Sequence, residues 1–173
     1  CPEAEPRRVH EGVLLLGLST SRRYYWKGGR IDAGQVARIG SAFAESVPLK
    51  ILMVHHPVFV AAGRSDRPVR GVERALRAAA AAGVDIVLCG HTHVQAHVDL
   101  SLSRPELGRH VLGIMGGTAT SRRVRAGEGQ SYNVLSLTDA GRLRLEVRQF
   151  RDGRFAPLLA QEWTRAPDGW RQA

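Results

Sequence analysis

The segment V-D-I-V-L-C-G-H-T-H-V-Q, Val84 to Gln95, sets both the expected fold and the expected site. Its largely apolar stretch 84–89 predicts a strand buried on both faces. Gly90 lets the backbone turn after that strand. Alternate residues of an extended segment face the same way and lie about 6.6 Å apart, at roughly 3.3 Å per residue. We therefore expect His91 and His93 to point into one pocket and Thr92 to point away.

Two helices and two further strands are expected before this segment. Asp32 and Gln35 have the spacing of a capping box at a helix N-terminus, and Pro48 closes that helix. An alanine-rich helix follows and stops at Gly83, as helices commonly do at glycine. Strands joined by helical crossovers run parallel, so the pattern predicts a β-α-β-α-β unit. The expected elements are strand 12–18, helix 33–47, strand 50–54, helix 72–82 and strand 84–89.

The rest of the chain is expected to form antiparallel strands. Apolar stretches alternate there with glycine-containing turn signals, as in hairpins. The turn signals are Gly116-Gly117, Asp139 to Gly141 and Arg151 to Gly153, and the expected strands are 111–115, 132–137, 143–150 and 155–163. The segment from Arg165 is expected to be a frayed tail.

The composition predicts one globular domain without a membrane span. The 173 residues are 43% hydrophobic and 24% charged, and no apolar run is long enough to cross a bilayer. The net charge of +9 rests on 25 basic residues scattered along the chain, all of them arginine except Lys27 and Lys50. Scattered charge by itself indicates only non-specific attraction, so we do not expect nucleic acid as the partner.

The two cysteines favour a reducing compartment. Cys89 lies in an apolar strand, where a free thiol behaves as a small apolar side chain, and two cysteines so placed form no disulfide framework. We therefore expect a cytoplasmic protein. The chain begins with Cys1 and not with methionine, so its first residue is not expected to be a translation start.

Histidines follow two of the expected parallel strands. His55 and His56 end one strand, and His91 and His93 follow the next. The carboxyl ends of parallel strands meet at one sheet edge, where ligand sites gather. His56 precedes Pro57 and is held extended, so only one of the first pair is expected to enter the site. Neutral imidazole binds zinc, iron, manganese or nickel. The alternative is that these histidines are structural or surface residues.

The other histidines carry weaker signals. His97 and Asp99 could extend the cluster, although a polar position at a sheet edge is the better interpretation. His10 and His110 have no partner pattern, and we expect both at the surface.

Longer motifs around these histidines resemble a known family. L-M-V-H-H-P-V-F (52–59) followed by V-D-I-V-L-C-G-H-T-H (84–93) resembles the last two metal-binding motifs of the calcineurin-like metallophosphoesterase superfamily. G-L-S-T-S-R (17–22) and W-K-G-G-R-I-D-A-G-Q (26–35) are similar to the segment that precedes those motifs in bacterial members. G-G-T-A-T-S-R-R (116–123) and S-Y-N-V-L-S-L (131–137) are similar to the segments on the C-terminal side of those motifs.

The resemblance implies a fold, a centre and a reaction. Members have a two-metal centre at the carboxyl ends of strands in a four-layer αββα sandwich. By motif, His55 and His91 would ligate one metal ion and His93 the other, while His56 would ligate neither. The cofactors would be two divalent or trivalent ions of manganese, iron or zinc. They would bind the phosphate oxygens of a phosphoester substrate, and a bridging water or hydroxide would attack phosphorus.

The sequence departs from the family in one large respect. The family's Asp-x-His, Gly-Asp-x-x-Asp and Gly-Asn-His-Asp/Glu motifs do not occur in it. The resemblance therefore assigns no catalytic residue to this chain. It implies that residues 1–164 are the C-terminal part of a metallophosphoesterase domain and that 165–173 are a tail. The expected fold class is α/β, the C-terminal half of the four-layer sandwich, with antiparallel strands after the β-α-β-α-β unit.

Three functions remain open at this point. The first is a metal-dependent phosphodiesterase or phosphatase in which this chain alone is inactive. The second is a non-catalytic domain that binds a partner or nucleic acid and keeps a residual metal site. The third is a mononuclear zinc hydrolase or lyase using His91, His93 and a third histidine. If the chain is part of a phosphodiesterase or phosphatase, strand 13–18 is expected to expose an unpaired edge. The missing N-terminal half or a second copy of the chain would then be the partner.

Overall fold

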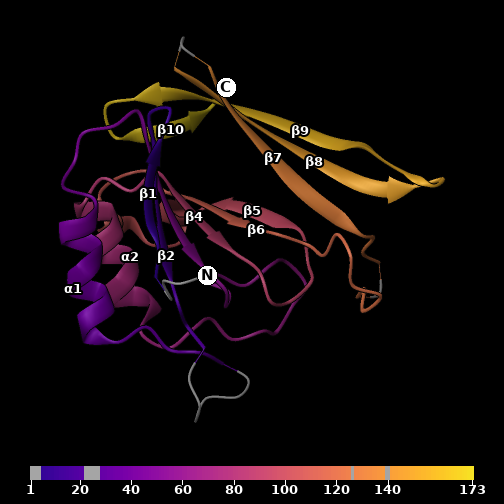
Figure 1. Ribbon diagram of the computed structural model, residues 1–173, viewed down its shortest axis with the longest axis horizontal. Coiled ribbons are helices and arrows are strands. Elements are labelled where there is room, and N and C mark those ends of the chain that lie inside the picture. Colours follow the sequence, from indigo (N-terminus) through magenta and orange to yellow (C-terminus); the bar gives the residue numbers. More distant parts are fainter. Residues whose placement is uncertain (1–4, 22–27, 126, 139–140) are drawn as a thin grey trace.

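The computed structural model describes residues 5–21, 28–125, 127–138 and 141–173, and a six-stranded sheet forms its centre (Figure 1). Its strands are β1 (Arg7–His10), β2 (Val13–Leu18), β3 (Leu49–Val54), β4 (Ile86–Cys89), β5 (Ala96–Asp99) and β6 (Leu112–Met115). Their spatial order is β1-β2-β3-β4-β6-β5. The inner strands β2, β3, β4 and β6 run parallel, while β1 and β5 pair antiparallel at the two edges. The expected parallel pairing of the first strands is confirmed.

Helices α1 (Ala33–Ala42) and α2 (Val72–Ala81) cover one face of this sheet. Asp32 caps α1 as expected: its carboxylate accepts from Gln35 N at 2.9 Å, and the Gln35 side chain accepts from Asp32 N at 3.0 Å. The helix ends at Ala42, earlier than expected, because the buried Phe43 adopts a non-helical conformation at the C-cap. Two short 3₁₀ helices, η1 (Leu100–Leu102) and η2 (Pro105–Leu107), lie between β5 and β6.

A second, antiparallel sheet packs on the opposite face of the first one (Figure 1). Its strands are β7 (Ser131–Thr138), β8 (Arg142–Arg151), β9 (Arg154–Ala166) and β10 (Gly169–Gln172), in the order β10-β9-β8-β7. The interface core comprises Leu49, Ile51, Ile86, Leu112 and Ile114 from the first sheet and Leu143, Leu145, Val147, Trp163 and Trp170 from the second. The first sheet is therefore apolar on both faces.

The predicted fold class, an α/β half of a four-layer αββα sandwich, is wrong. The described residues form ten strands and two α-helices, and both helices lie in one layer, so the layers are helix, sheet and sheet. The outer face of the second sheet carries charged side chains that pair with one another, as Arg144 and Arg148 do with Glu146. A face with paired charges is solvated and is a poor surface for a further helical layer.

Two other expectations about the chain are corrected. Strand β2 has no unpaired edge, because β1 covers it with the register Arg7↔Leu16 to His10↔Val13. The segment from Arg165 is not frayed, because β10 pairs with β9 and the Trp170 side chain is 1% exposed.

Two expectations concern residues outside the described ranges. One is the interpretation of Cys1, and the other is the turn at Asp139 to Gly141, of which only Gly141 is described. Within the described part of the chain, neither α-helix is long and apolar enough to cross a bilayer.

Candidate metal centre

The parallel pairing of β3 and β4 brings two of the predicted ligands together. The register aligns Met53 with Leu88, and Gly90 N donates to His55 O at 3.1 Å, which extends the ladder past the strand ends. His55 and His91 thus leave neighbouring strands at the same edge. Their Nε2 and Nδ1 atoms lie 3.0 Å apart.

His56 completes a group of three imidazoles. Its ring lies 4.6 Å from the His91 ring and 5.0 Å from the His55 ring. One ligand nitrogen from each histidine lies within 4.8 Å of the others. Within the described ranges this is the one set of three or more histidine, cysteine or acidic side chains so arranged, and it includes no carboxylate.

The histidine group, meaning His55, His56 and His91, has the spacing of a metal site. Two nitrogens that ligate one zinc ion tetrahedrally, each at 2.0–2.1 Å, lie about 3.3 Å apart. The 3.0 Å between His55 Nε2 and His91 Nδ1 is close to that separation. Imidazole suits zinc, iron and manganese alike. The pair of His55 and His91 therefore fits one metal ion, and the group holds no acidic ligand with which to bridge two.

The backbone of the Gly90-to-His93 segment is not extended, contrary to prediction. His91 has φ 74° and His93 has φ 59°, both in the left-handed region. Thr92 N donates to Gly90 O at 2.9 Å and closes a tight turn between the two. Left-handed non-glycine residues cost about 1–3 kcal/mol each and gather at functional sites. Thr92 is buried, with its hydroxyl 3.0 Å from Met115 Sδ.

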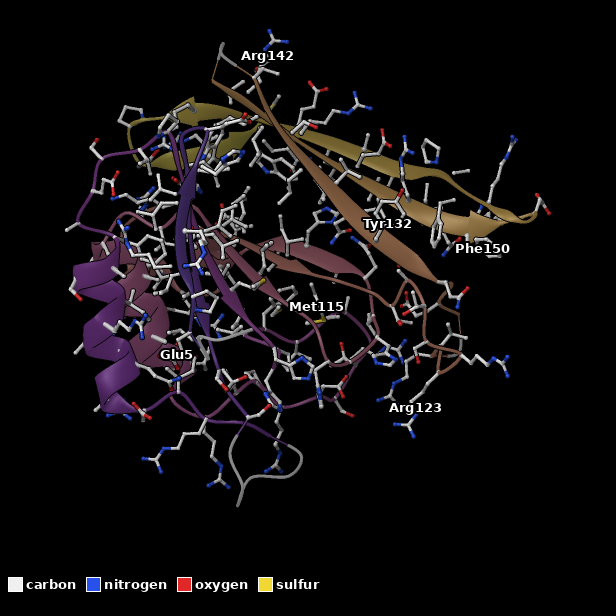
Figure 2. The ribbon with its side chains drawn as sticks, viewed as in Figure 1. Glu5, Met115, Arg123, Tyr132, Arg142 and Phe150 are labelled. Carbon is white, nitrogen blue, oxygen red and sulfur yellow. The ribbon has the colours of Figure 1, made fainter. Side chains whose placement is uncertain are left out.

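His93 lies outside the histidine group, although its ring is also oriented. Its Nδ1 lies 2.6 Å from the carbonyl oxygen of Arg123, in the loop between β6 and β7 (Figure 2). A carbonyl only accepts, so Nδ1 donates the proton, and a lone pair for ligation could come only from Nε2. Metal-binding histidines are commonly oriented by such a bond to a backbone carbonyl. The orientation of His93 therefore suits it to bind a metal ion through Nε2. That ion would be a different one from the ion that the histidine group could hold.

The buried environment of His56 was not predicted. Its Nδ1 lies 2.7 Å from Thr20 Oγ1, and its backbone N–H donates to the same hydroxyl oxygen at 3.3 Å. Gly29 packs against the ring, with a φ of 57°, and a Cβ added there would lie 2.4 Å from His56 Nδ1. Thr20 and Gly29 are distant in sequence from His56. Spacing along the chain therefore carries no signal for this contact.

The environment of two members of the group, His56 and His91, favours the neutral form of the imidazole. Burial lowers the pKa of His56 to about 4, with smaller contributions from the His91 and His55 imidazoles. Burial also lowers the pKa of His91, followed by the effects of His55 and His93. Metal ligands must be deprotonated to bind, so neutral rings are ready to coordinate.

A cavity of about 720 Å³ opens beside His55, between the two sheets. Met53, Leu88 and Leu135 contribute apolar walls, and Tyr132 and Asn133 of β7 line it as well. Figure 2 shows Tyr132 on the second sheet, and its ring packs edge-on against that of Phe155, while the side chain of Asn133 contacts the Met115 backbone. The histidine group therefore adjoins a space that is open to further polypeptide or to ligand.

The remaining histidines lie apart from the group. His97 and Asp99 are on the edge strand β5, as the polar-edge interpretation predicted. His10 is exposed, as predicted. His110 is not a free surface residue, because its Nδ1 lies 2.5 Å from Asp99 Oδ2 and its Nε2 lies 3.8 Å from Asp168 Oδ2.

Comparison with known proteins leaves the family open. No protein-family model matches the chain, and no curated protein matches it. Among solved structures, it is similar to a hypothetical protein from Thermus thermophilus, at 18% identity and a TM-score of 0.39. That match covers 92% of this chain and 60% of the other, so the chain spans about three fifths of the length of that neighbour.

Proposed function

We propose that this chain contributes metal ligands to a metal-dependent phosphoester hydrolase, a phosphodiesterase or phosphatase of the calcineurin-like kind. The observation that carries the proposal is the 3.0 Å approach of His55 Nε2 and His91 Nδ1 at the carboxyl ends of parallel strands. His55 and His91 would hold one ion, and His93 would serve a second one through Nε2. The ions would be manganese, iron or zinc, which polarise phosphate oxygens and activate water.

Each side chain of the site has its own task in this proposal. His55 and His91 fix the position of the ion at the sheet edge, and the Arg123 carbonyl fixes the orientation of His93. His56 packs behind them. Its contact with Thr20 holds one ring nitrogen, so His56 supports the two ligand rings from the buried side and would ligate neither ion.

A partner is also part of the proposal, because the histidine group lacks the acidic ligands of a dinuclear site. We propose that the remaining ligands come from a further N-terminal polypeptide segment or from a second copy of the chain. The open cavity beside His55 supports this, as it leaves apolar walls for such a segment to cover. A cytoplasmic setting is proposed as well, supported by the free, buried thiol of Cys89, whose pKa is raised to about 11 by burial.

Hydrolysis of bis(4-nitrophenyl) phosphate tests the proposal. The 173-residue chain should hydrolyse it no faster than buffer with the same Mn²⁺ or Zn²⁺ concentration. The chain expressed together with any polypeptide encoded before Cys1 should hydrolyse it in a metal-dependent way, and His91→Ala should abolish that activity. Turnover that survives His91→Ala would contradict the proposed function. Turnover by the 173-residue chain alone would contradict the need for a partner.

A mononuclear zinc hydrolase or lyase is a second candidate. The absence of a carboxylate from the histidine group favours it, since a single ion needs no bridging ligand. Metal stoichiometry distinguishes the two, with two ions per active protein expected for the first candidate and one for the second.

A further inference from the structure

A second cavity, of about 310 Å³, opens beside His91 and is dominated by positive charge. Arg67, Arg70 and Arg125 line it, and Asp66 is the one acidic side chain among its described walls. Guanidinium groups remain charged at every physiological pH. The three guanidinium groups are exposed, and even after the Asp66 carboxylate is counted the described walls carry a net positive charge that attracts anions.

Contacts between two separate segments hold these arginines near the histidine group. Arg67 and Arg70 belong to the segment between β3 and α2, whereas Arg125 belongs to the loop between β6 and β7. The ion pair of Arg64 with Glu128, at 3.5 Å, joins those segments. This cavity is therefore assembled by tertiary contacts and is not a chance run of arginines along the sequence.

One of the arginines is attached directly to the turn that carries the predicted ligands. Arg125 Nε donates to Thr92 O at 3.2 Å, and Thr92 lies between His91 and His93. This bond uses Nε and leaves the two terminal nitrogens of the guanidinium available beside His91. Arginine binds phosphate through paired N–H groups, which makes an oriented guanidinium well suited to that anion.

We propose that this cavity binds a phosphate group. The arginine cavity lies next to the histidine group, and this position indicates the class of ligand. A small molecule with two phosphates, such as a diphosphate ester, could place one phosphate in the arginine cavity and the other at the histidine group. The choice of a two-phosphate substrate rests on the proposed function, whereas phosphate binding by the cavity does not. A volume near 300 Å³ is at the lower end of small-ligand sites and would admit the terminal part of such a molecule.

Calorimetric titration with inorganic pyrophosphate in the presence of EDTA tests the cavity independently of any metal. Arg67→Gln and Arg125→Gln should each weaken binding by about tenfold or more, the loss expected for hydrogen bonds to a charged group. Arg154→Gln is the matched control, because Arg154 is exposed at the β8–β9 turn and its loss changes the net charge equally. That variant should bind within about twofold of the parent, a shift well below one such bond.

The outcomes separate the two proposals. Equal affinities of Arg67→Gln, Arg154→Gln and the parent chain, or no binding by the parent, would overturn the arginine cavity as a phosphate site. Arg67 is exposed, so Arg67→Gln decides the test even if Arg125→Gln does not fold, which circular dichroism would reveal. Pyrophosphate binding in EDTA, combined with a complete protein that shows no metal-dependent hydrolysis, would leave this inference standing and remove the proposed function.

Discussion

Two histidine sites in this molecule use imidazole in opposite ways. The histidine group at the ends of β3 and β4 includes no acidic side chain, and burial, followed by the effect of neighbouring imidazoles, lowers the pKa of His56 and of His91. His110, at the other site, lies between the carboxylates of Asp99 and Asp168. It links the segment before β6 to the turn before β10, since His110 N also donates to Asp168 O at 2.7 Å.

The difference shows that the partners of a histidine decide its role more than the residue itself does. Imidazoles that burial keeps neutral, such as that of His56, offer a lone pair, which is what a metal ion requires. An imidazole between carboxylates forms charge-assisted hydrogen bonds, which join elements of the fold. The first site should therefore control metal binding and the second should control stability alone.

The largest expected effect separates the two sites by metal affinity. His91→Ala removes a proposed ligand and should weaken zinc binding by more than about a hundredfold, because even the loss of a residue that only orients a ligand costs 10–100-fold. His110→Ala should leave zinc affinity unchanged. Competition with a chromophoric zinc chelator measures both. Equal losses of zinc affinity in His91→Ala and His110→Ala would contradict the distinction between the two sites.

The packing of Gly29 against His56 gives the next effect, with an adjacent glycine as control. Gly29→Ala should destabilise the protein by about 2–4 kcal/mol, because the new Cβ would clash with the His56 ring and the left-handed φ disfavours alanine. Gly28→Ala should be nearly neutral, since a Cβ there meets nothing within 4 Å. Urea denaturation gives both free energies of unfolding. A neutral Gly29→Ala would mean that His56 is not held as described.

The lowered pKa of His56 predicts a loss of stability in acid for the metal-free protein. The unfolded chain, with an ordinary pKa near 6.5, binds a proton that the folded state resists until about pH 4. Stability is therefore complete above pH 6.5 and falls as the pH decreases toward 4, by up to about 3 kcal/mol.

Denaturation curves between pH 7 and pH 4 measure this change in the free energy of unfolding. His110→Gln should retain the loss, because His110 lies at the other site. An unfolding free energy that stays constant from pH 6.5 to pH 4 in metal-free buffer would contradict the burial of a neutral His56.

The smallest effect belongs to the carboxylate site. Burial opposes ionisation of Asp99, but hydrogen bonds from Ser101 and His110 outweigh it and lower the pKa of this carboxyl. Asp99→Asn should cost about 1–2 kcal/mol in the free energy of unfolding at pH 7. A double-mutant cycle with His110→Gln should show coupling of at least about 0.5 kcal/mol. Additive costs would mean that the two side chains do not act as a pair.

The order of the elements could be predicted from sequence, whereas the number of layers could not. Buried strands are rich in apolar residues, as β4 is throughout and β3 is apart from Lys50, and glycine or proline lies close to their ends. The strand β8 alternates arginine or glutamate with leucine or valine, and that alternation predicts one solvated face. The expectation of four layers followed from the resemblance to the calcineurin-like superfamily and did not take the alternation in β8 into account. Strands β1 and β5 are short and polar, so they carried no signal.

The candidate site could be predicted only where strand pairing determines it. His55 and His91 meet because parallel strands end at one edge, and sequence suffices for that. The left-handed backbone of His91 and His93 could not be predicted, because histidine, like other non-glycine residues, adopts that conformation only uncommonly, and the bond from Arg125 to Thr92 O joins residues 33 positions apart. The approach of His56 depends on Thr20, 36 residues away along the chain.

Anomalous scattering from crystals of the chain grown with zinc tests the central claim most directly. We predict a peak at the absorption edge of zinc within about 2.0–2.1 Å of both His55 Nε2 and His91 Nδ1. That ion would replace the hydrogen bond that joins these nitrogens at 3.0 Å. The contradicting result is a histidine group that keeps this hydrogen bond in saturating zinc, with no anomalous peak between the two rings.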